Sequence, residues 1–120
     1  VRILRDGRLR DTKDLPLTDM QGQARRIVIG RAAHCDITIP QDFYVSEEHC
    51  MFQLDSGQNL TISNLRDTHG TFIFRGENRI RVNGTKPVFA GDRILVGPYT
   101  ELAIEIVRPL GRYVGVQGIE

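Results

Sequence analysis

Two pairs of neighbouring residues offer the side chains that zinc prefers. His34-Cys35 and His49-Cys50 together supply two imidazoles and two thiols. Adjacent residues of a strand point to opposite faces, however, and the sequence has neither the CxxC nor the HxxxH spacing of a zinc site. We therefore predict no metal site and interpret both cysteines as small buried thiols. So few cysteines in a short chain also favour a reducing compartment.

A second group of residues has the types found in a hydrolase triad, namely Ser46, His49 and an aspartate such as Asp67. No nucleophile elbow surrounds Ser46, and Ser-x-x-His spacing does not by itself create the geometry between a nucleophile and its base. The glycine-rich signatures of nucleotide binding, GxGxxG and GxxxxGK, do not occur in the sequence. We therefore expect neither an enzyme nor a bound cofactor.

Polar residues concentrate in three segments that we predict to be loops. Gly30-Arg31 directly follows a hydrophobic run, and it is joined by the segments 45–49 (VSEEH) and 65–71 (LRDTHGT). A rigid scaffold usually presents its binding residues on loops. These three segments are therefore the best candidates for a binding surface.

The composition predicts the scaffold that must position these loops. The 120 residues include 29 β-branched residues but only five alanines, and glycine and proline together contribute 17. Branched side chains favour sheets over helices, while glycine and proline supply turns. Alternation and turn signals predict short strands at residues 1–5, 15–17, 27–29, 36–39, 49–55, 60–63, 71–74, 79–82, 88–89, 93–96 and 100–107. So many short strands predict an all-β sandwich.

Charge and hydropathy exclude several other functions. Sixteen basic and fifteen acidic residues leave a formal charge of +1, and aspartates are interleaved with the arginines, which disfavours nucleic-acid binding. No apolar run is long enough to cross a membrane, and no basic start followed by an apolar run indicates a signal peptide. We therefore expect a cytoplasmic domain without membrane insertion, taken from a longer signalling or secretion-associated protein.

Six short motifs occur in an order that is similar to a known family. They are IVIGR, CDITIP, VSEEHC, RDTHGTF, VNG and AGDRILVG, and the similarity covers residues 1–108. In this order they resemble the forkhead-associated (FHA) domain. The resemblance implies a β-sandwich of about eleven mostly antiparallel strands with recognition loops at one end. Residues 109–120 contain three glycines without helical periodicity, so we expect a flexible or partner-docked tail there.

FHA domains bind phosphothreonine in partner proteins, so the resemblance implies a phosphothreonine-bearing partner, or a phosphorylated segment of the same parent chain. Arg31 would grip the phosphate with its fork of N–H donors, and Ser46 and Thr68 would donate to the same group. His69 stands where the family has an asparagine that contacts the peptide backbone. The residues that would support the loops are Gly30, His49, Gly70 and Thr71.

Two departures from the family pattern bear on phosphate binding. An asparagine amide carries a donor and an acceptor on one short arm, whereas His69 carries them on opposite sides of a ring. Glu47 and Glu48 follow Ser46 where many relatives have basic or neutral residues, and Asp42 lies nearby in the sequence. These carboxylates either oppose a phosphate or select a partner with basic residues beside its phosphothreonine.

A third departure concerns the hairpin over residues 74–81, which is longer than is common in the family and carries Arg75, Arg79 and Arg81. These arginines offer a second contact surface.

The departures also leave an alternative function open. In that alternative the domain keeps its fold but acts as a phosphate-independent scaffold or assembly module with an altered pocket.

Overall fold

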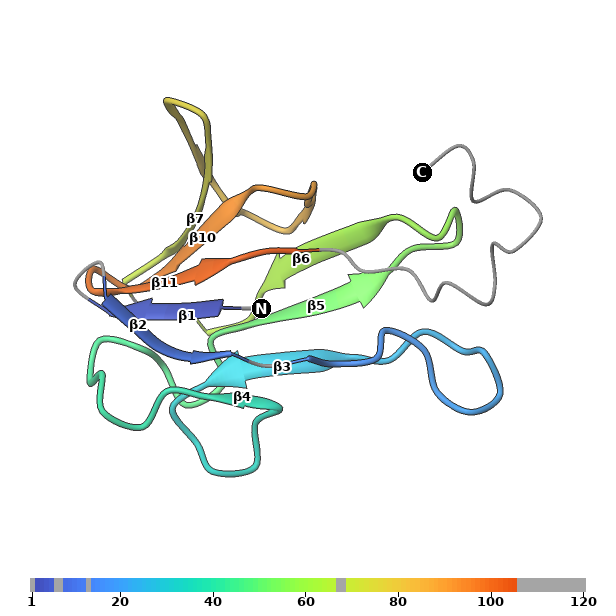
Figure 1. The fold of residues 1–120 in the computed structure, drawn as a ribbon, viewed down its shortest axis with the longest axis horizontal. Coiled ribbons are helices and arrows are strands. Elements are labelled where there is room, and N and C mark those ends of the chain that lie inside the picture. The colour runs from blue at the N-terminus through green and yellow to red at the C-terminus, as the bar shows by residue number, and fades with distance from the viewer. Residues whose placement is uncertain (1, 6–7, 13, 67–68, 106–120) are drawn as a thin grey trace.

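The structure is a computed structural model that describes residues 2–5, 8–12, 14–66 and 69–105. These residues form eleven strands arranged in two sheets, and the described part of the chain contains no helix. The two sheets pack against each other as a sandwich (Figure 1). The predicted all-β fold is therefore confirmed.

The first sheet has six strands in the order β2-β1-β11-β10-β7-β8, and each neighbouring pair is antiparallel. Its strands are β1 (Arg2–Arg5), β2 (Arg8–Thr12), β7 (Thr71–Arg75), β8 (Asn78–Arg81), β10 (Arg93–Val96) and β11 (Thr100–Ala103). Strand β8 therefore lies at one edge of this sheet, and the hairpin that it forms with β7 is at the top of Figure 1.

The second sheet has five strands in the order β4-β3-β5-β6-β9. Its strands are β3 (Ile27–Gly30), β4 (Ile37–Thr38), β5 (Cys50–Leu54), β6 (Leu60–Asn64) and β9 (Thr85–Pro87). Only β3 and β4 pair in parallel, with Ile29 opposite Ile37, among the described strands. Because parallel neighbours need a crossover, the chain must leave the sheet after Gly30, and this excursion carries Arg31.

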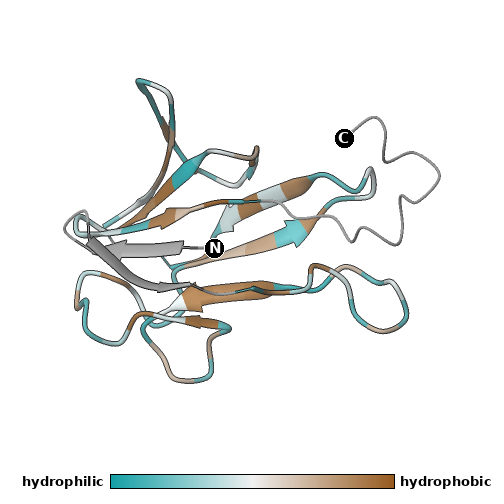
Figure 2. Cartoon of the chain, in the orientation of Figure 1, coloured by the Kyte–Doolittle hydropathy of each residue, from teal (hydrophilic) through white to brown (hydrophobic). Residues whose placement is uncertain are grey.

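The core lies between the sheets and follows the alternation of each strand. Ile27 and Ile29 of β3 are fully buried while Val28 between them is partly exposed, as expected when successive side chains point to opposite faces. In Figure 2 β3 is hydrophobic along its length, whereas the loops around it are mostly hydrophilic. The other large, fully buried aliphatic residues include Ile37, Ile62, Ile73, Ile94 and Leu102.

Three strand predictions were wrong in position. Residues 15–17 form no strand, because Pro16 lacks a donor and Leu15 and Leu17 instead pack their side chains against the core. The strand predicted at residues 88–89 lies at Thr85–Pro87. Strand β11 ends at Ala103, before the predicted residue 107.

Strand β2 had no counterpart in the prediction. Its sequence RLRDT has no apolar alternation, so no local pattern predicts a strand there. It lies at the edge of the sheet and pairs with β1. Within the described residues no helix is long and apolar enough to cross a membrane. The turn expected at residues 6–7 and the tail expected at residues 109–120 lie outside the described residues.

Candidate functional site

Two of the predicted loops are joined by backbone hydrogen bonds at one end of the sandwich. The N–H of Arg31 donates to the carbonyl of Ser46 at 3.0 Å, and the N–H of Ala32 donates to the carbonyl of Glu47 at 3.2 Å. In Figure 1 the loops after β3 and after β4 lie together at the lower left. The first and second predicted binding segments therefore meet directly in space.

Gly30 permits this close approach because it has no side chain. A Cβ atom at this position would lie 2.7 Å from the carbonyl carbon of Glu47, closer than real Cβ contacts, and would also crowd the Sγ of Cys35. The contact is with backbone, which cannot rotate away as a flexible side chain can. A glycine is therefore required where β3 passes the loop that carries Ser46.

Arg31 is partly buried, and its side chain is held along the second loop. Its Nε donates to the carbonyl of Val45 at 3.1 Å, and its guanidinium carbon lies 5.9 Å from the centre of the Phe43 ring. Within the described residues, no other hydrogen bond or ion pair of this side chain is found. The two terminal nitrogens can therefore donate to an anion while Nε fixes the direction of the group.

His49 links the second loop to the third. The backbone N–H of Ser46 donates to Nδ1 of His49 at 3.0 Å, so Nε2 carries the proton and donates to the carbonyl of Gly70 at 2.9 Å. The side chain of His49 is completely buried. Both ring nitrogens thus hold backbone groups of two different loops in place.

Gly70 and Thr71 lead from the third loop into β7. Gly70 has φ of +87°, a conformation that residues with a Cβ rarely adopt. Thr71 is fully buried, and its Oγ1 has no hydrogen-bond partner among the described residues. His69 is exposed beside them, whereas the predicted phosphate ligand Thr68 and the aspartate Asp67 lie outside the described residues.

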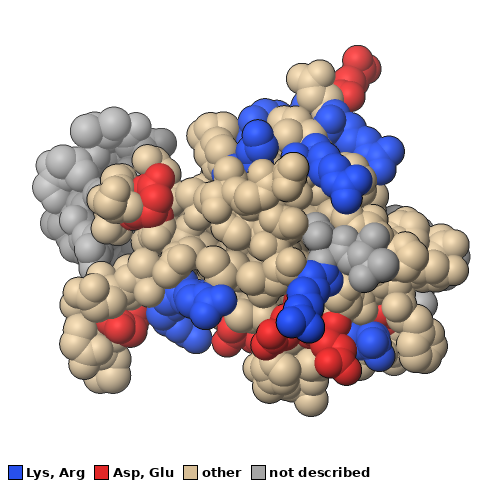
Figure 3. Space-filling model, turned by 180° about the vertical axis from the view of Figure 1, so that it is seen from behind, with Lys and Arg blue, Asp and Glu red and all other residues tan. Residues whose placement is uncertain are grey.

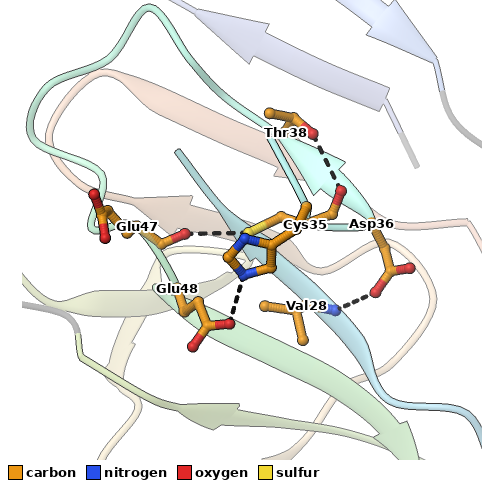
Figure 4. Close-up of polar contacts among 7 residues, drawn as sticks. Val28, Cys35, Asp36, Thr38, Glu47 and Glu48 are labelled. Carbon is orange, nitrogen blue, oxygen red and sulfur yellow. Dashed lines mark hydrogen bonds and ion pairs between the residues drawn. The ribbon is translucent and has the colours of Figure 1, made fainter. Parts of the chain in front are cut away.

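The acidic residues of the second loop have different surroundings. Glu48 accepts from Nε2 of His34 at 2.7 Å, the contact that ends at Glu48 in Figure 4. The side chain of Glu47 is exposed and is directed away from Cys35 in the same figure. Among the described residues of the segment 45–49, only Glu47 therefore has a carboxylate with no side-chain partner.

Asp42 does not belong to this acidic surface, contrary to what its sequence position indicates. It is buried, and its carboxylate accepts from the hydroxyl of Thr100 at 2.6 Å and from the N–H of Tyr44 at 3.0 Å. These bonds tie the second loop to the start of β11. Asp42 therefore positions the loop and is shielded from anything bound outside it.

Sequence reasoning missed a row of aromatic side chains between the loops. The ring of Tyr44 packs edge-on against His69, with 5.0 Å between ring centres, and against Tyr99 at 5.4 Å. Phe43, Tyr44 and Tyr99 are all exposed. The exposed aromatic pair Phe43-Tyr44 next to Ser46 was a usable signal, but Tyr99 lies too far along the chain for its contact to be foreseen.

Both cysteines are buried and neither forms a disulfide, in line with their interpretation as small buried thiols. The described residues contain no cluster of side chains that could hold a metal ion. Burial, and then the nearby charge of Glu48, raises the pKa of the Cys35 thiol. This thiol donates to the carbonyl of Glu47 at 3.1 Å, while Thr38 donates to the carbonyl of Cys35 at 3.2 Å (Figure 4). Cys35 thus packs and steadies the loop that follows Arg31.

Comparisons with known proteins agree with this architecture. A search of curated protein sequences found no match. The chain is similar to the solution structure of the FHA domain of an Arabidopsis thaliana hypothetical protein, with 24% identity, coverage of 90% of this chain and 86% of that one, and a TM-score of 0.63. It is also similar to the N-terminal FHA domain of S. cerevisiae Rad53p in complex with a phosphothreonine peptide, with 21% identity, coverage of 88% and 92%, and a TM-score of 0.65. The FHA domain model matches residues 27–97, more than half of the sequence, so the chain belongs to the FHA domain family.

Proposed function

We propose that this domain binds phosphothreonine in a partner protein and so acts as a phosphorylation-dependent interaction module. The main support is the pair of backbone hydrogen bonds that holds Arg31 beside the loop carrying Ser46. The structure of the similar S. cerevisiae domain contains a phosphothreonine peptide, which supports the same role here. In this proposal residues 1–108 form the binding domain and residues 109–120 a tail, within a larger cytoplasmic protein.

Phosphate binding follows from the donors on these loops. A phosphothreonine side chain carries nearly two negative charges at neutral pH and three acceptor oxygens. The terminal nitrogens of Arg31 match two of these oxygens, and the Ser46 hydroxyl supplies another donor. We assign the third donor to Thr68 and a contact with the peptide backbone to His69.

Binding without hydrolysis is the better interpretation of Ser46 and His49. A catalytic histidine must offer a ring nitrogen to the hydroxyl of its serine. Here Nδ1 accepts from the backbone of Ser46, and Nε2 donates to the backbone of Gly70. The ring therefore serves the loops, which supports an interaction module rather than an enzyme.

The residues around Arg31 favour particular neighbours of the phosphothreonine. The carboxylate of Glu48 accepts a hydrogen bond from His34, so Glu47 is the carboxylate that would select a basic peptide residue. Tyr44 and Tyr99 offer exposed aromatic surface that would favour an apolar residue. We therefore infer a preferred peptide in which basic and apolar residues flank the phosphothreonine.

Fluorescence-polarisation titrations would test the proposal with a phosphothreonine peptide library and the unphosphorylated twin of each peptide. We expect Arg31→Ala to weaken phosphopeptide binding by about tenfold or more, since it removes charged hydrogen bonds. The affinity of Arg31→Lys should lie between those of the wild type and Arg31→Ala, because lysine keeps the charge but loses the fork of N–H donors. Arg26→Ala is the matched control, an exposed arginine outside the loops, and should leave binding unchanged.

Two results would contradict the proposal. If no phosphopeptide bound more tightly than its twin, the domain would be the phosphate-independent scaffold that the sequence left open. If Arg31→Ala and Arg26→Ala weakened binding equally, general charge attraction would account for the affinity. Thermal unfolding of each variant would verify that the fold is retained.

A further inference from the structure

The outer surface of β7, β8 and β10 combines two phenylalanines with three arginines. On β7, Phe72 and Phe74 alternate with the buried Ile73 and therefore point away from the core. The register places Phe72 opposite Arg81 and Phe74 opposite Arg79 on β8, and Phe74 opposite Arg93 on β10. We call these five residues the arginine–phenylalanine face.

Each arginine of this face lies over an aromatic ring. The guanidinium carbon of Arg79 is 4.0 Å from the centre of the Phe72 ring, and that of Arg81 is 5.7 Å from the same ring. The guanidinium carbon of Arg93 is 5.5 Å from the Phe74 ring. Stacking restricts a guanidinium without using its N–H groups, so these donors are held in place for a carboxylate at a smaller entropic cost.

The charges of this face are only partly compensated. Arg93 pairs with Glu101 at 3.3 Å, whereas Arg79 and Arg81 are exposed and form no ion pair within the described residues. Figure 3 shows blue side chains gathered at the upper right, below the tip of the β7–β8 hairpin. Two arginines at the edge of the sheet therefore have donors available to a partner.

Arg75 does not contribute to this face, although the sequence grouped it with the other hairpin arginines. It binds the buried carboxylate of Asp92 through Nε at 3.0 Å and through a terminal nitrogen at 2.8 Å. Its guanidinium carbon lies 4.5 Å from the centre of the Phe89 ring. Arg75 therefore ties the end of β7 to the loop before β10, and Arg79 and Arg81 present the charge.

The face continues to the recognition loops. A terminal nitrogen of Arg81 lies 3.8 Å from the place that a Cβ at Gly70 would occupy. The phenylalanine rings of the face are covered by guanidinium groups, which makes them poor platforms for stacking bases. Two acidic residues also lie nearby, Glu77 in the β7–β8 turn and Glu101 on the neighbouring strand β11. This pattern favours separate carboxylates over the continuous phosphates of a nucleic acid.

We propose that the arginine–phenylalanine face binds an acidic segment of a protein partner. Carboxylates of the segment would accept from the terminal nitrogens of Arg79 and Arg81, and its apolar atoms would contact the exposed parts of Phe72 and Phe74. This contact does not depend on the phosphate site. A partner that carries both an acidic segment and a phosphothreonine would use both surfaces, with a gain in avidity.

The experiment uses a fluorescein-labelled, unphosphorylated peptide of alternating glutamate and leucine and measures its fluorescence polarisation with the full chain. The double variant Arg79→Gln/Arg81→Gln should weaken binding by about tenfold, because two charged donors are lost. Arg79→Lys/Arg81→Lys should weaken it by about threefold, because the charge remains but the fork and the stacking are lost. Arg31→Ala should leave it unchanged.

A matched control removes two arginines that lie directly before β3, away from both the hairpin and the recognition loops. Arg25→Gln/Arg26→Gln changes the net charge equally and should alter binding of the acidic peptide by less than about twofold. In heteronuclear NMR spectra, the peptide should shift the amide signals of residues 72–81 more than those of residues 31–49. The unfolding temperature of each variant shows whether its fold is retained.

Three outcomes would overturn the proposal. The first is no measurable binding of the acidic peptide at low salt. The second is an equal loss of binding in Arg79→Gln/Arg81→Gln and in the control double variant, which would mean that net charge alone determines the affinity. The third is that a single-stranded oligonucleotide binds more tightly than the acidic peptide and loses this affinity when Arg79 and Arg81 are replaced. The face would then be a nucleic-acid surface. The phosphothreonine proposal is tested by Arg31→Ala with phosphopeptides, so its failure would be seen separately.

Discussion

The recognition loops and the arginine–phenylalanine face present arginine side chains to a partner in two different ways. Arg31 lies on irregular backbone, and its position depends on Gly30, on the buried ring of His49 and on the buried carboxylate of Asp42. Arg79 and Arg81 lie on a regular strand, and their positions follow from the ladder with β7. The first surface needs buried polar residues, whereas the second needs only alternation and stacking.

This difference determines how each surface should respond to mutation. A loop held by a few specific bonds loses its geometry when one of them is removed, because nothing else fixes the backbone. A strand keeps its geometry after a surface substitution, so binding loses only the contacts of the replaced side chain. Variants that remove a buried contact of the loops should therefore change both stability and binding, while variants of the face should change binding alone.

The largest effect is expected for Gly30→Ala. The new Cβ would meet the backbone of Glu47, so β3 and the second loop must separate, at a cost of about 3 kcal/mol in the free energy of unfolding. Phosphopeptide binding should fall with it. Urea unfolding followed by circular dichroism measures the first effect.

Gly76→Ala is the control for this substitution. Gly76 lies in the tip of the hairpin with φ of +61° and open space where a Cβ would be, so only backbone strain of about 1 kcal/mol is expected. Equal losses of stability in the two variants would show that the contact between β3 and the second loop is not as close as described.

The next effect concerns the ion pair between Arg75, at the end of β7, and Asp92, and it depends on pH. Burial acts to raise the pKa of Asp92, but hydrogen bonds from Arg75 and from the N–H of Phe89 outweigh it, so the pKa lies below its ordinary value. A lowered pKa means that the carboxylate stabilises the fold above the ordinary Asp pKa, about 3.9, and that this stability is lost as pH falls through the lower folded value.

Asp92→Asn should therefore lower the free energy of unfolding by about 2 kcal/mol at pH 7, and the difference from the wild type should narrow below about pH 4. Glu101→Gln removes a carboxylate from the more exposed pair with Arg93 and should cost less than about 0.5 kcal/mol. Urea unfolding at several pH values measures both. A difference that stayed constant into acid would show that the charge of Asp92 does not stabilise the fold.

Much of the scaffold could be predicted because its signals are local. The runs Ile27–Ile29 and Ile94–Val96 are short and apolar, and each is followed by a glycine that favours a turn, so the sequence itself indicates strands there. The charged strand β2 was missed because it lacks an apolar pattern and pairs with β1, a contact that composition does not reveal.

The contacts of the candidate site could be predicted only in part. The motifs put Arg31 and Ser46 in loops that do meet in the structure, yet Asp42 was grouped with the exposed acids, because its partner Thr100 lies 58 residues away. Tyr99 was missed for the same reason, since it reaches Tyr44 only when the sheets have packed. Side chains that tie distant loops together leave little trace in the local sequence.

A smaller effect is expected for Thr100→Val, which tests this long-range contact. Valine keeps the shape of threonine but removes the hydroxyl that donates to Asp42, at a cost of about 1.5 kcal/mol in the free energy of unfolding. Phosphopeptide affinity should fall by about threefold, because the loop with Tyr44 and Ser46 loses one of its anchors. Thr85→Val removes the hydroxyl of an exposed contact with Ser63 and serves as the control, without effect on binding. Equal behaviour of the two variants would exclude a positioning role for Asp42.

The smallest effect is expected for Glu47→Lys, which changes charge at the phosphate site without touching a buried bond. The Glu47 side chain is exposed, so it interacts with a bound phosphate mostly through solvent, and reversal of its charge should tighten phosphopeptide binding by only about two- to fivefold. The gain should shrink as salt is added, because screening weakens exposed charges first.

Glu77→Lys makes the same charge change at the hairpin tip and should leave phosphopeptide affinity unchanged. Isothermal titration calorimetry at low and high salt measures both variants. An unchanged affinity for Glu47→Lys would mean that its carboxylate does not oppose phosphate, and weaker binding only of peptides with basic flanks would assign it to the selection of those flanks.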